Sequence, residues 1–374
     1  MREYLLVLLT AAMTTYLLAG MCRRIALRVG ALAMVRDRDV HAVPIPYFGG
    51  VAMLGGIAGA LLLAAQLPFL GRFALVSHDS MSILLAGLVI CVVGVLDDLI
   101  DLPALAKFAG QILAAAIVVT NGVRMYWIPL ANSIFALDQA SSIVITVFFI
   151  VLCANAVNFV DGLDGLAAGV VAIGAGAFFV YTYLLAYEQD ITRATTASLV
   201  TVGVTGVCLG FLPHNFSPAR MFMGDSGALL LGLLMACSVI SLTGQIDSSA
   251  LSATNGSLVP SYLPIVLPFA IMAIPLLDLV MAYVRRTMNG NWWFVADKQH
   301  LHHRLLQKGH SQAGAVGVMY LWTAILSFGT VAIGMRTNAW TIGGTCVAVV
   351  VATVVTLLRG RRSQPAPAGT SGAA

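Results

Sequence analysis

Residues 155–165 read Asn-Ala-Val-Asn-Phe-Val-Asp-Gly-Leu-Asp-Gly, and they lie between two long apolar runs at about 140–154 and 166–186. Ionisable side chains at the boundary of a bilayer lose hydration, so two carboxylates and two carboxamides are costly here and indicate a function. Asp161 and Asp164 are three residues apart, which places both carboxylates on one side if the segment is helical. Because such a pair repels itself, we expect positive charge beside it.

The whole chain has the composition of an integral membrane protein. Of its 374 residues, 59% are hydrophobic and 10% are charged, whereas soluble domains carry about 25% charged residues. The mean hydropathy is +0.93. The apolar runs are continuous and near the length of a membrane-spanning helix, unlike the alternating strands of an outer-membrane barrel. We therefore expect an all-α polytopic membrane protein.

About eleven apolar runs are long enough to cross a bilayer. They are 4–22, 48–66, 81–97, 104–121, 140–157, 166–186, 194–212, 227–243, 262–284, 316–335 and 338–358. These runs predict a single transmembrane helical domain over residues 1–358. The tail at 359–374 is basic and then rich in Pro, Ala, Gly and Ser, so we expect it to be disordered.

Lys and Arg are distributed unevenly between the two sets of connections. If the N-terminus is outside, fifteen of the 20 basic residues lie in inner connections and five in outer ones, as the positive-inside rule requires. The first run has Arg2 before it and Arg23, Arg24 and Arg28 after it, the reverse of the charge order in a signal peptide. We interpret it as a retained first span, with the C-terminus in the cytoplasm.

Two further acidic clusters lie at the edges of apolar runs. Residues 97–101 read Asp-Asp-Leu-Ile-Asp, and residues 224–227 read Gly-Asp-Ser-Gly. Each cluster alone could be a helix cap. The predicted orientation, however, places both clusters and the segment at 155–165 on the cytoplasmic side. Carboxylate and amide oxygens without cysteine suit a hard cation, usually Mg²⁺ where phosphates supply further ligands. We therefore expect a cytoplasm-facing cleft formed by the inner connections at about 36–50, 97–107, 158–165, 213–227 and 285–312.

Histidines gather in the last inner connection, where residues 300–304 read His-Leu-His-His-Arg. His300 and His303 would share a helical face with Asp297, so a zinc site is one interpretation. The surrounding Lys and Arg residues favour an anion-binding surface instead, because His and Arg donate hydrogen bonds to phosphate. The six cysteines show no CxxC or CxxH spacing, so we expect neither disulfides nor thiolate metal sites.

Four segments together resemble the inner-loop motifs of the polyprenyl-phosphate N-acetylhexosamine-1-phosphate transferase superfamily, of the glycosyltransferase family 4 type. They are Val-Leu-Asp-Asp at 95–98, the segment at 155–165, Met-Gly-Asp-Ser-Gly at 223–227 and His-Leu-His-His-Arg at 300–304, in the family's order. The resemblance extends from about Arg36 to Gln312.

The chain resembles two branches of this superfamily. The chain is most similar to the bacterial UDP-N-acetylglucosamine—undecaprenyl/decaprenyl-phosphate N-acetylglucosamine-1-phosphate transferases. The alternative is the phospho-N-acetylmuramoyl-pentapeptide transferase of peptidoglycan synthesis. That branch typically has three consecutive histidines and ten spans, whereas here Leu301 interrupts the histidines and about eleven spans are expected.

The resemblance implies a role for each matching residue. Asn158 and Asp225 would coordinate Mg²⁺, for which Mn²⁺ is a substitute. Asp97 and Asp98 would lie where the lipid phosphate reacts, and Lys107 would neutralise the nucleotide diphosphate. Asp161 and Asp164 match acidic positions of the catalytic loops. The residues expected to bind substrate are, besides Lys107, His300, His302, His303, Arg304, Arg38 and His41.

The implied reaction transfers N-acetylglucosamine-1-phosphate from UDP-N-acetylglucosamine to a polyprenyl phosphate in a bacterial plasma membrane and releases UMP. It would be the first membrane step of a cell-envelope glycan. A phosphomonoester is mostly a dianion at pH 7, so direct attack by the lipid phosphate needs no strong base. The alternative mechanism is a covalent phospho-sugar intermediate on Asp98.

Membrane lipids and a second copy of the chain are further expected partners, and no nucleic acid is. An ion-coupled transporter is the remote alternative from another functional class. Transporters usually place charged sites near the midplane and contain inverted repeats. Here the acidic residues gather at one predicted face and no repeat is evident, which favours the enzyme.

Overall fold

The computed structural model describes residues 1–33, 44–130, 133–188, 192–243, 269–270, 272–288, 305 and 309–357. Within these ranges the chain forms eleven α-helices, and each overlaps one of the predicted spans. Nine are long and apolar enough to cross a membrane. These are α1 (Arg2–Val29), α2 (Gly49–Gln66), α3 (Ala74–Ile100), α5 (Gln139–Val160), α6 (Leu166–Glu188), α7 (Thr192–Asn215), α8 (Gly224–Thr243), α13 (Gln312–Met335) and α14 (Ala339–Leu357).

Two shorter helices complete this set, namely α4 (Ala104–Thr120) and α11 (Ala273–Met288). The all-α polytopic fold is therefore confirmed. The predicted ninth span began at residue 262, but residues 262–268 lie outside the described part of the chain. The tail at 359–374 also lies outside it.

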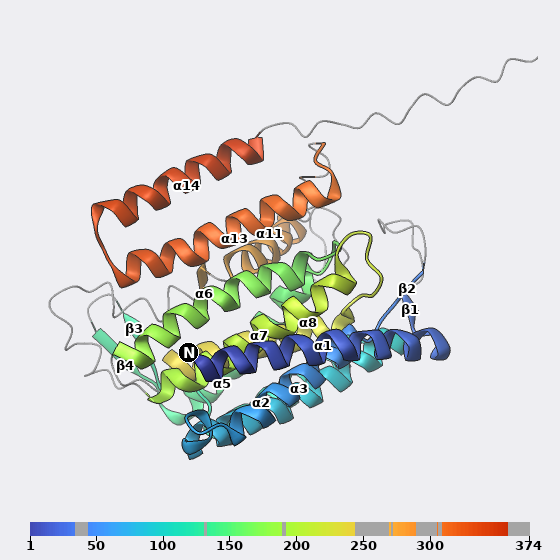
Figure 1. Cartoon of the computed structure of the whole chain (residues 1–374), viewed down its shortest axis with the longest axis horizontal. Coiled ribbons are helices and arrows are strands. Elements are labelled where there is room, and N and C mark those ends of the chain that lie inside the picture. Colours follow the sequence, from blue (N-terminus) through green and yellow to red (C-terminus); the bar gives the residue numbers. More distant parts are fainter. Residues whose placement is uncertain are drawn as a thin grey trace, which may run out of the picture.

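Helix α8 forms the centre of the bundle (Figure 1). It packs against α2, α3, α5 and α7, and 94% of its apolar window is buried inside the protein. Glycines at its interfaces allow the backbone of α8 to lie close to the backbones of neighbouring helices. A Cβ atom on Gly94 of α3 would lie 2.3 Å from the Ser226 Cα, and one on Gly232 would lie 2.5 Å from the Ala154 Cα. These glycines fix how closely α8 approaches its neighbours.

Helices α13 and α14 form one edge of the bundle (Figure 1). α13 packs on α6 and α11, while α14 contacts α13. Only 6% of the apolar window of α14 is buried. The Trp322 Nε1–H donates a hydrogen bond of 2.9 Å to the Thr356 hydroxyl and ties the two helices together. α14 therefore presents nearly its whole surface to the surroundings, as a helix at the bilayer rim does.

Two short antiparallel hairpins lie at opposite ends of the bundle (Figure 1). One pairs β1 (Leu32–Ala33) with β2 (Ile45–Pro46), and the other pairs β3 (Trp127–Leu130) with β4 (Ser133–Ala136). The second hairpin lies between the predicted spans at 104–121 and 140–157, where no strand was predicted. Its aromatic and β-branched residues favour extended backbone, but four-residue strands are too short to give a recognisable alternation.

Substituting Gly94 by alanine should separate α3 from α8, because the new methyl group would meet backbone atoms that cannot rotate away. We expect a loss of about 1–3 kcal/mol in stability, as for other overpacked cores, measured as a lower melting temperature in detergent. Gly343→Ala in α14 is the matched control, since a Cβ there meets nothing within 4 Å. Equal melting temperatures for the two variants would contradict this account of the interface.

Candidate functional site

The C-terminal end of α3 meets the N-terminal end of α8 through one carboxylate. Asp98 Oδ1 accepts a hydrogen bond of 2.9 Å from the Asp225 backbone N–H. Its Oδ2 accepts bonds from the Ser226 N–H at 3.4 Å and the Ser226 hydroxyl at 3.1 Å. The first N–H groups of a helix lack partners within the helix, and a negative group is favourable there. Asp98 thus caps α8 from a different helix.

Gly224 allows this contact. Its backbone has φ of +68°, and a Cβ atom at this position would lie 2.3 Å from Asp98 Oδ2. Any other residue would be strained by its backbone conformation and would collide with the carboxylate. The sequence predicted that Asp225 or Ser226 could cap α8 themselves. Instead, both donate to Asp98, which leaves the Asp225 side chain available at the site.

Lys107, in the first turn of α4, holds two acidic side chains. Its Nζ lies 3.2 Å from Asp97 Oδ2 and also forms an ion pair with Asp225 Oδ2. The other oxygen of Asp97 accepts a 3.0 Å bond from the Leu102 N–H. The other oxygen of Asp225 accepts a 2.8 Å bond from Asn158 Nδ2. Side chains from α3, α4, α5 and α8 therefore converge on Asp225.

The turn between α5 and α6 borders this cluster. α5 ends at Val160, so Asp161 and Asp164 lie in a turn and not on a common helical face. Asp164 Oδ2 accepts a 3.0 Å bond from the Ala219 N–H. Gly165 donates its N–H to Asn215 Oδ1 at 3.0 Å, and its carbonyl accepts a 2.5 Å bond from the Tyr320 hydroxyl of α13. The turn is thus fixed to three other parts of the bundle.

Negative charge exceeds positive charge among the described side chains of this cluster. Desolvation, followed by repulsion from Asp98 and Asp164, raises the pKa of Asp161 to about 7. Within the described part of the chain, Lys107 is the basic side chain that forms ion pairs with this cluster. The carboxylates of Asp97 and Asp225 and the amide of Asn158 are hard oxygen donors of the kind that Mg²⁺ prefers. The donor set and the excess negative charge both fit a divalent cation.

The described residues contain no group of three or more His, Cys, Asp or Glu side chains that could hold a metal ion alone. An Mg²⁺ site built on Asp225 and Asn158 would therefore need further ligands besides these two side chains. Mg²⁺ commonly completes its shell with water and substrate phosphates. The arrangement accordingly suits a cation that arrives together with a phosphorylated substrate.

The structure brings together the predicted residues Asp97, Asp98, Lys107, Asn158 and Asp225, with Asp161 and Asp164 in the adjacent turn. Asp101, the last acidic residue of the cluster at 97–101, ends α3 with a left-handed backbone of φ 49°. The other predicted substrate-binding residues lie outside the described residues: Arg38, His41, His300, His302, His303 and Arg304. Asp297, which belongs to the alternative zinc site, also lies outside the described residues.

Several supporting residues were not predicted. Gln111, which is 2% exposed, forms a paired amide contact with Asn155, with Nδ2 of Asn155 at 2.6 Å from Oε1 of Gln111. A lone glutamine in the apolar run at 104–121 is the signal that could have identified it. Ser226, Asn215 and Tyr320 also support the site. Their roles depend on contacts between distant segments, which a single sequence does not reveal.

Comparisons with known proteins cover the same residues. The model of a family described as glycosyl transferase family 4 matches residues 80–243. The "decaprenyl-phosphate N-acetylglucosaminephosphotransferase" of Mycobacterium tuberculosis (strain ATCC 25618 / H37Rv) is 45% identical over 367 residues, covering 96% of this chain and 90% of the relative. A "probable undecaprenyl-phosphate N-acetylglucosaminyl 1-phosphate transferase" of Bacillus subtilis (strain 168) is 32% identical, covering 88% and 84%.

The other branch matches over a shorter length. The "phospho-N-acetylmuramoyl-pentapeptide-transferase" of Desulforudis audaxviator (strain MP104C) is 35% identical over 215 residues, which cover 52% of this chain and 62% of the relative. The similarity to the N-acetylglucosamine phosphotransferases thus extends over nearly the whole chain, whereas the similarity to the pentapeptide transferase spans about half of it.

Removing the Asp98 carboxylate should destabilise the protein, because the N–H groups of Asp225 and Ser226 would lose their acceptor, while the Ser226 hydroxyl would keep the Met223 carbonyl at 3.1 Å. We expect Asp98→Ala to cost about 1–3 kcal/mol, seen as a lower melting temperature in detergent. Asp98→Asn keeps one acceptor oxygen and should lose less. An alanine variant as stable as the unmodified protein would show that Asp98 does not fix α8.

Proposed function

The chain belongs to glycosyl transferase family 4, and on this premise we propose that it transfers N-acetylglucosamine-1-phosphate from UDP-N-acetylglucosamine to a polyprenyl phosphate. The products would be polyprenyl-diphosphate-N-acetylglucosamine and UMP. The names of the relatives that match nearly the full chain support both the sugar and the lipid. The observation that carries the proposal is the convergence of Asp97, Lys107, Asn158 and Asp225 at one end of membrane-spanning helices.

The proposed substrates are both anions, whereas the described cluster of site residues is rich in carboxylates. Like charges repel strongly where water is displaced, so the substrates need added positive charge. We propose that Asp225 and Asn158 hold Mg²⁺, with Mn²⁺ as a substitute. Bound there, the cation would neutralise the diphosphate and polarise its phosphoryl oxygens. Asn158 can take part because its amide carries an oxygen as well as the nitrogen that now donates to Asp225.

Lys107 is proposed to stabilise the leaving group. An oxygen of the lipid phosphate attacks the β-phosphorus of the nucleotide sugar, and the bond between this phosphorus and the bridging oxygen breaks. The bridging oxygen leaves with UMP and gains negative charge. An ammonium group already fixed by Asp97 and Asp225 needs little reorganisation to meet that charge. Such transfers depend mainly on in-line positioning and charge neutralisation.

Direct attack by the lipid phosphate is favoured over a covalent intermediate on Asp98. Both oxygens of Asp98 accept hydrogen bonds from the start of α8, so the carboxylate is poorly available as a nucleophile. At pH 7 the lipid phosphate is mostly a dianion and needs little help from a base. We propose that Asp98 positions Asp225, and that Asp97 orients the acceptor and takes up any residual proton.

The cellular arrangement is also part of the proposal. The distribution of Lys and Arg favours an N-terminus outside a bacterial plasma membrane, with the site in a cytoplasm-facing cleft and the C-terminus in the cytoplasm. Arg38, His41, His300, His302, His303 and Arg304 are proposed to bind the substrates, and a homodimer stays a prediction.

The reaction can be tested with purified protein, a polyprenyl phosphate, Mg²⁺ and radiolabelled UDP-N-acetylglucosamine. We expect labelled lipid and UMP in equal amounts. EDTA should abolish both products, and added Mg²⁺ or Mn²⁺ should restore them. Asp225→Ala should be inactive at every metal concentration. Product formed only with UDP-N-acetylmuramoyl-pentapeptide would assign the chain to the other branch, and no product with any UDP-sugar would overturn the proposal.

The role of Lys107 can be separated from its contribution to folding. Lys107→Gln removes the charge and should lower kcat by about 10²–10³, the usual cost of losing one group that stabilises transition-state charge. Lys107→Arg keeps the charge in a different shape and should lose less. Melting temperatures of both variants provide the folding control. A glutamine variant that folds and retains near-normal kcat would exclude this role.

A further inference from the structure

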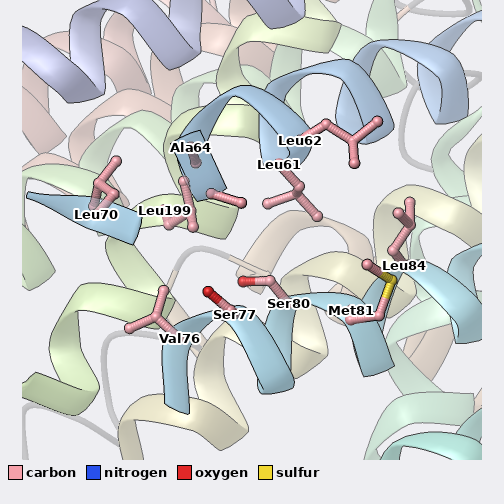
Figure 2. A pocket seen from close by; sticks show the side chains of 11 residues that line it. Leu61, Leu62, Ala64, Leu70, Val76, Ser77, Ser80, Met81, Leu84 and Leu199 are labelled. Carbon is pink, nitrogen blue, oxygen red and sulfur yellow. The ribbon is translucent and has the colours of Figure 1, made fainter. Parts of the chain in front are cut away.

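An apolar pocket lies at the other end of the bundle from the carboxylates. It has a cavity volume of about 70 Å³ and an open side, and residues of α2, α3, α7 and the short helix η1 (Leu70–Arg72) line it (Figure 2). Met81 lines it and lies 17 positions before Asp98 along α3. At 1.5 Å per residue this is roughly 25 Å, so the pocket is distinct from the site described above.

The walls of the pocket are hydrophobic except at two hydroxyl groups. Leu61, Leu84 and Met81 are among the apolar lining residues, whereas the hydroxyl oxygens of Ser77 and Ser80 point into the space between α2 and α3 (Figure 2). Pockets that enclose a whole small molecule usually measure about 300–1,000 Å³, so this open pocket has room for one segment of a longer ligand. The combination suits an elongated apolar ligand that also carries a hydrogen-bond acceptor.

Ser80 is the more informative of the two serines. It is 5% exposed, and its hydroxyl has no hydrogen-bond partner within the described residues. A serine inside a helix commonly donates to the carbonyl four residues earlier, as Ser82 does to His78 at 3.0 Å. Leaving a buried hydroxyl unpaired is costly. A ligand with an acceptor oxygen in the pocket would satisfy Ser80.

A cation lies on the same short helix as the lining residue Leu70. The guanidinium of Arg72 lies 4.6 Å from the ring centre of Phe69 and 4.7 Å from that of Phe73. Arg72 forms no ion pair within the described ranges of the chain, and its neighbour Leu70 lines the pocket. The Glu3 carboxylate accepts bonds of 2.9 Å from the Phe69 and Leu70 N–H groups and holds this turn in place.

The chemical groups follow a defined order along α3. The cation of Arg72 precedes the helix, the hydroxyls of Ser77 and Ser80 lie in its first turns, and apolar walls extend to Leu84. In a glycerophospholipid, the phosphate, the ester carbonyls and the acyl chains follow the same order. We propose that this pocket binds a glycerophospholipid, with its phosphate on Arg72, an ester carbonyl at Ser80 and an acyl chain between α2 and α3.

Two observations favour this ligand over the tail of a polyprenyl phosphate. A polyprenyl tail is pure hydrocarbon and offers no acceptor to Ser80, whereas an ester carbonyl does. The side chains of Leu62 and Met81, at 58% and 49% exposure, also line the pocket. Since these helices span a membrane, the exposed side of the pocket faces bilayer lipids, which can enter laterally.

The test uses the full chain, freed of lipid in detergent, with titrations followed by native mass spectrometry and thermal unfolding. The probes are phosphatidylglycerol, its diether analogue without ester carbonyls, and a polyprenyl phosphate. We expect phosphatidylglycerol to bind and to raise the melting temperature. The diether lipid should bind the unmodified protein several-fold more weakly.

Variants of the pocket sharpen the test. Arg72→Gln should weaken phosphatidylglycerol binding by about tenfold, the order expected for one charge-assisted contact. Ser80→Ala should weaken the ester lipid several-fold and leave the diether lipid unchanged, which a general loss of folding would not do. Arg336→Gln, in the turn between α13 and α14, and Val347→Phe, on the exposed surface of α14, are controls that should leave binding unchanged.

Two outcomes would overturn the proposal. One is equal binding of the ester and diether lipids with no effect of Arg72→Gln or Ser80→Ala. The other is tighter binding of polyprenyl phosphate than of phosphatidylglycerol, with competition between them that depends on Arg72. Neither outcome bears on the transferase assay, because none of these variants alters a residue of the carboxylate site.

Discussion

The hydrogen bonds from the start of α8 to the Asp98 carboxylate are the interaction on which the candidate site depends. A helix that ends at the edge of a membrane must satisfy its first backbone N–H groups, because little water reaches them. Here the acceptor comes from α3, so satisfying the backbone also fixes one helix against another. Gly94 and Gly224 allow this close approach. Asp225 is held in place as a consequence.

The chemistry of the site follows from its unbalanced charge. Lys107 compensates part of the negative charge, and Asp161 remains in surroundings that disfavour its ionised form. A protein that only needed stability would gain little from such a cluster, because burying unpaired carboxylates is costly. The arrangement is reasonable if a cation and phosphorylated substrates complete it. Under the proposed function, the cation and the substrates would complete this site.

The sequence predicted the helices well because the bilayer allows few solutions. Every backbone group in the membrane must be paired, so long apolar runs form helices, and all eleven described helices overlap predicted spans. The motifs also predicted that Asp97, Asp98, Lys107, Asn158 and Asp225 come together, and in the structure they do. The hydrogen-bond partner of each carboxylate or carbonyl oxygen could not be predicted. That Asp98 caps α8, or that Tyr320 bonds to Gly165, depends on how helices distant in sequence pack, and the hairpin of β3 and β4 was too short to recognise.

The bond between Tyr320 and Gly165 joins residues that are 155 positions apart in the chain. Chains are made from the N-terminus and insert while synthesis continues. The turn that carries Asp161 and Asp164 is therefore translated well before the helix that holds it in place. A nascent chain would contain most of the acidic residues before it could keep them in their final arrangement. The completed site thus depends on the order of biosynthesis, and a ribosome that stops before α13 would leave that turn with two of its three contacts.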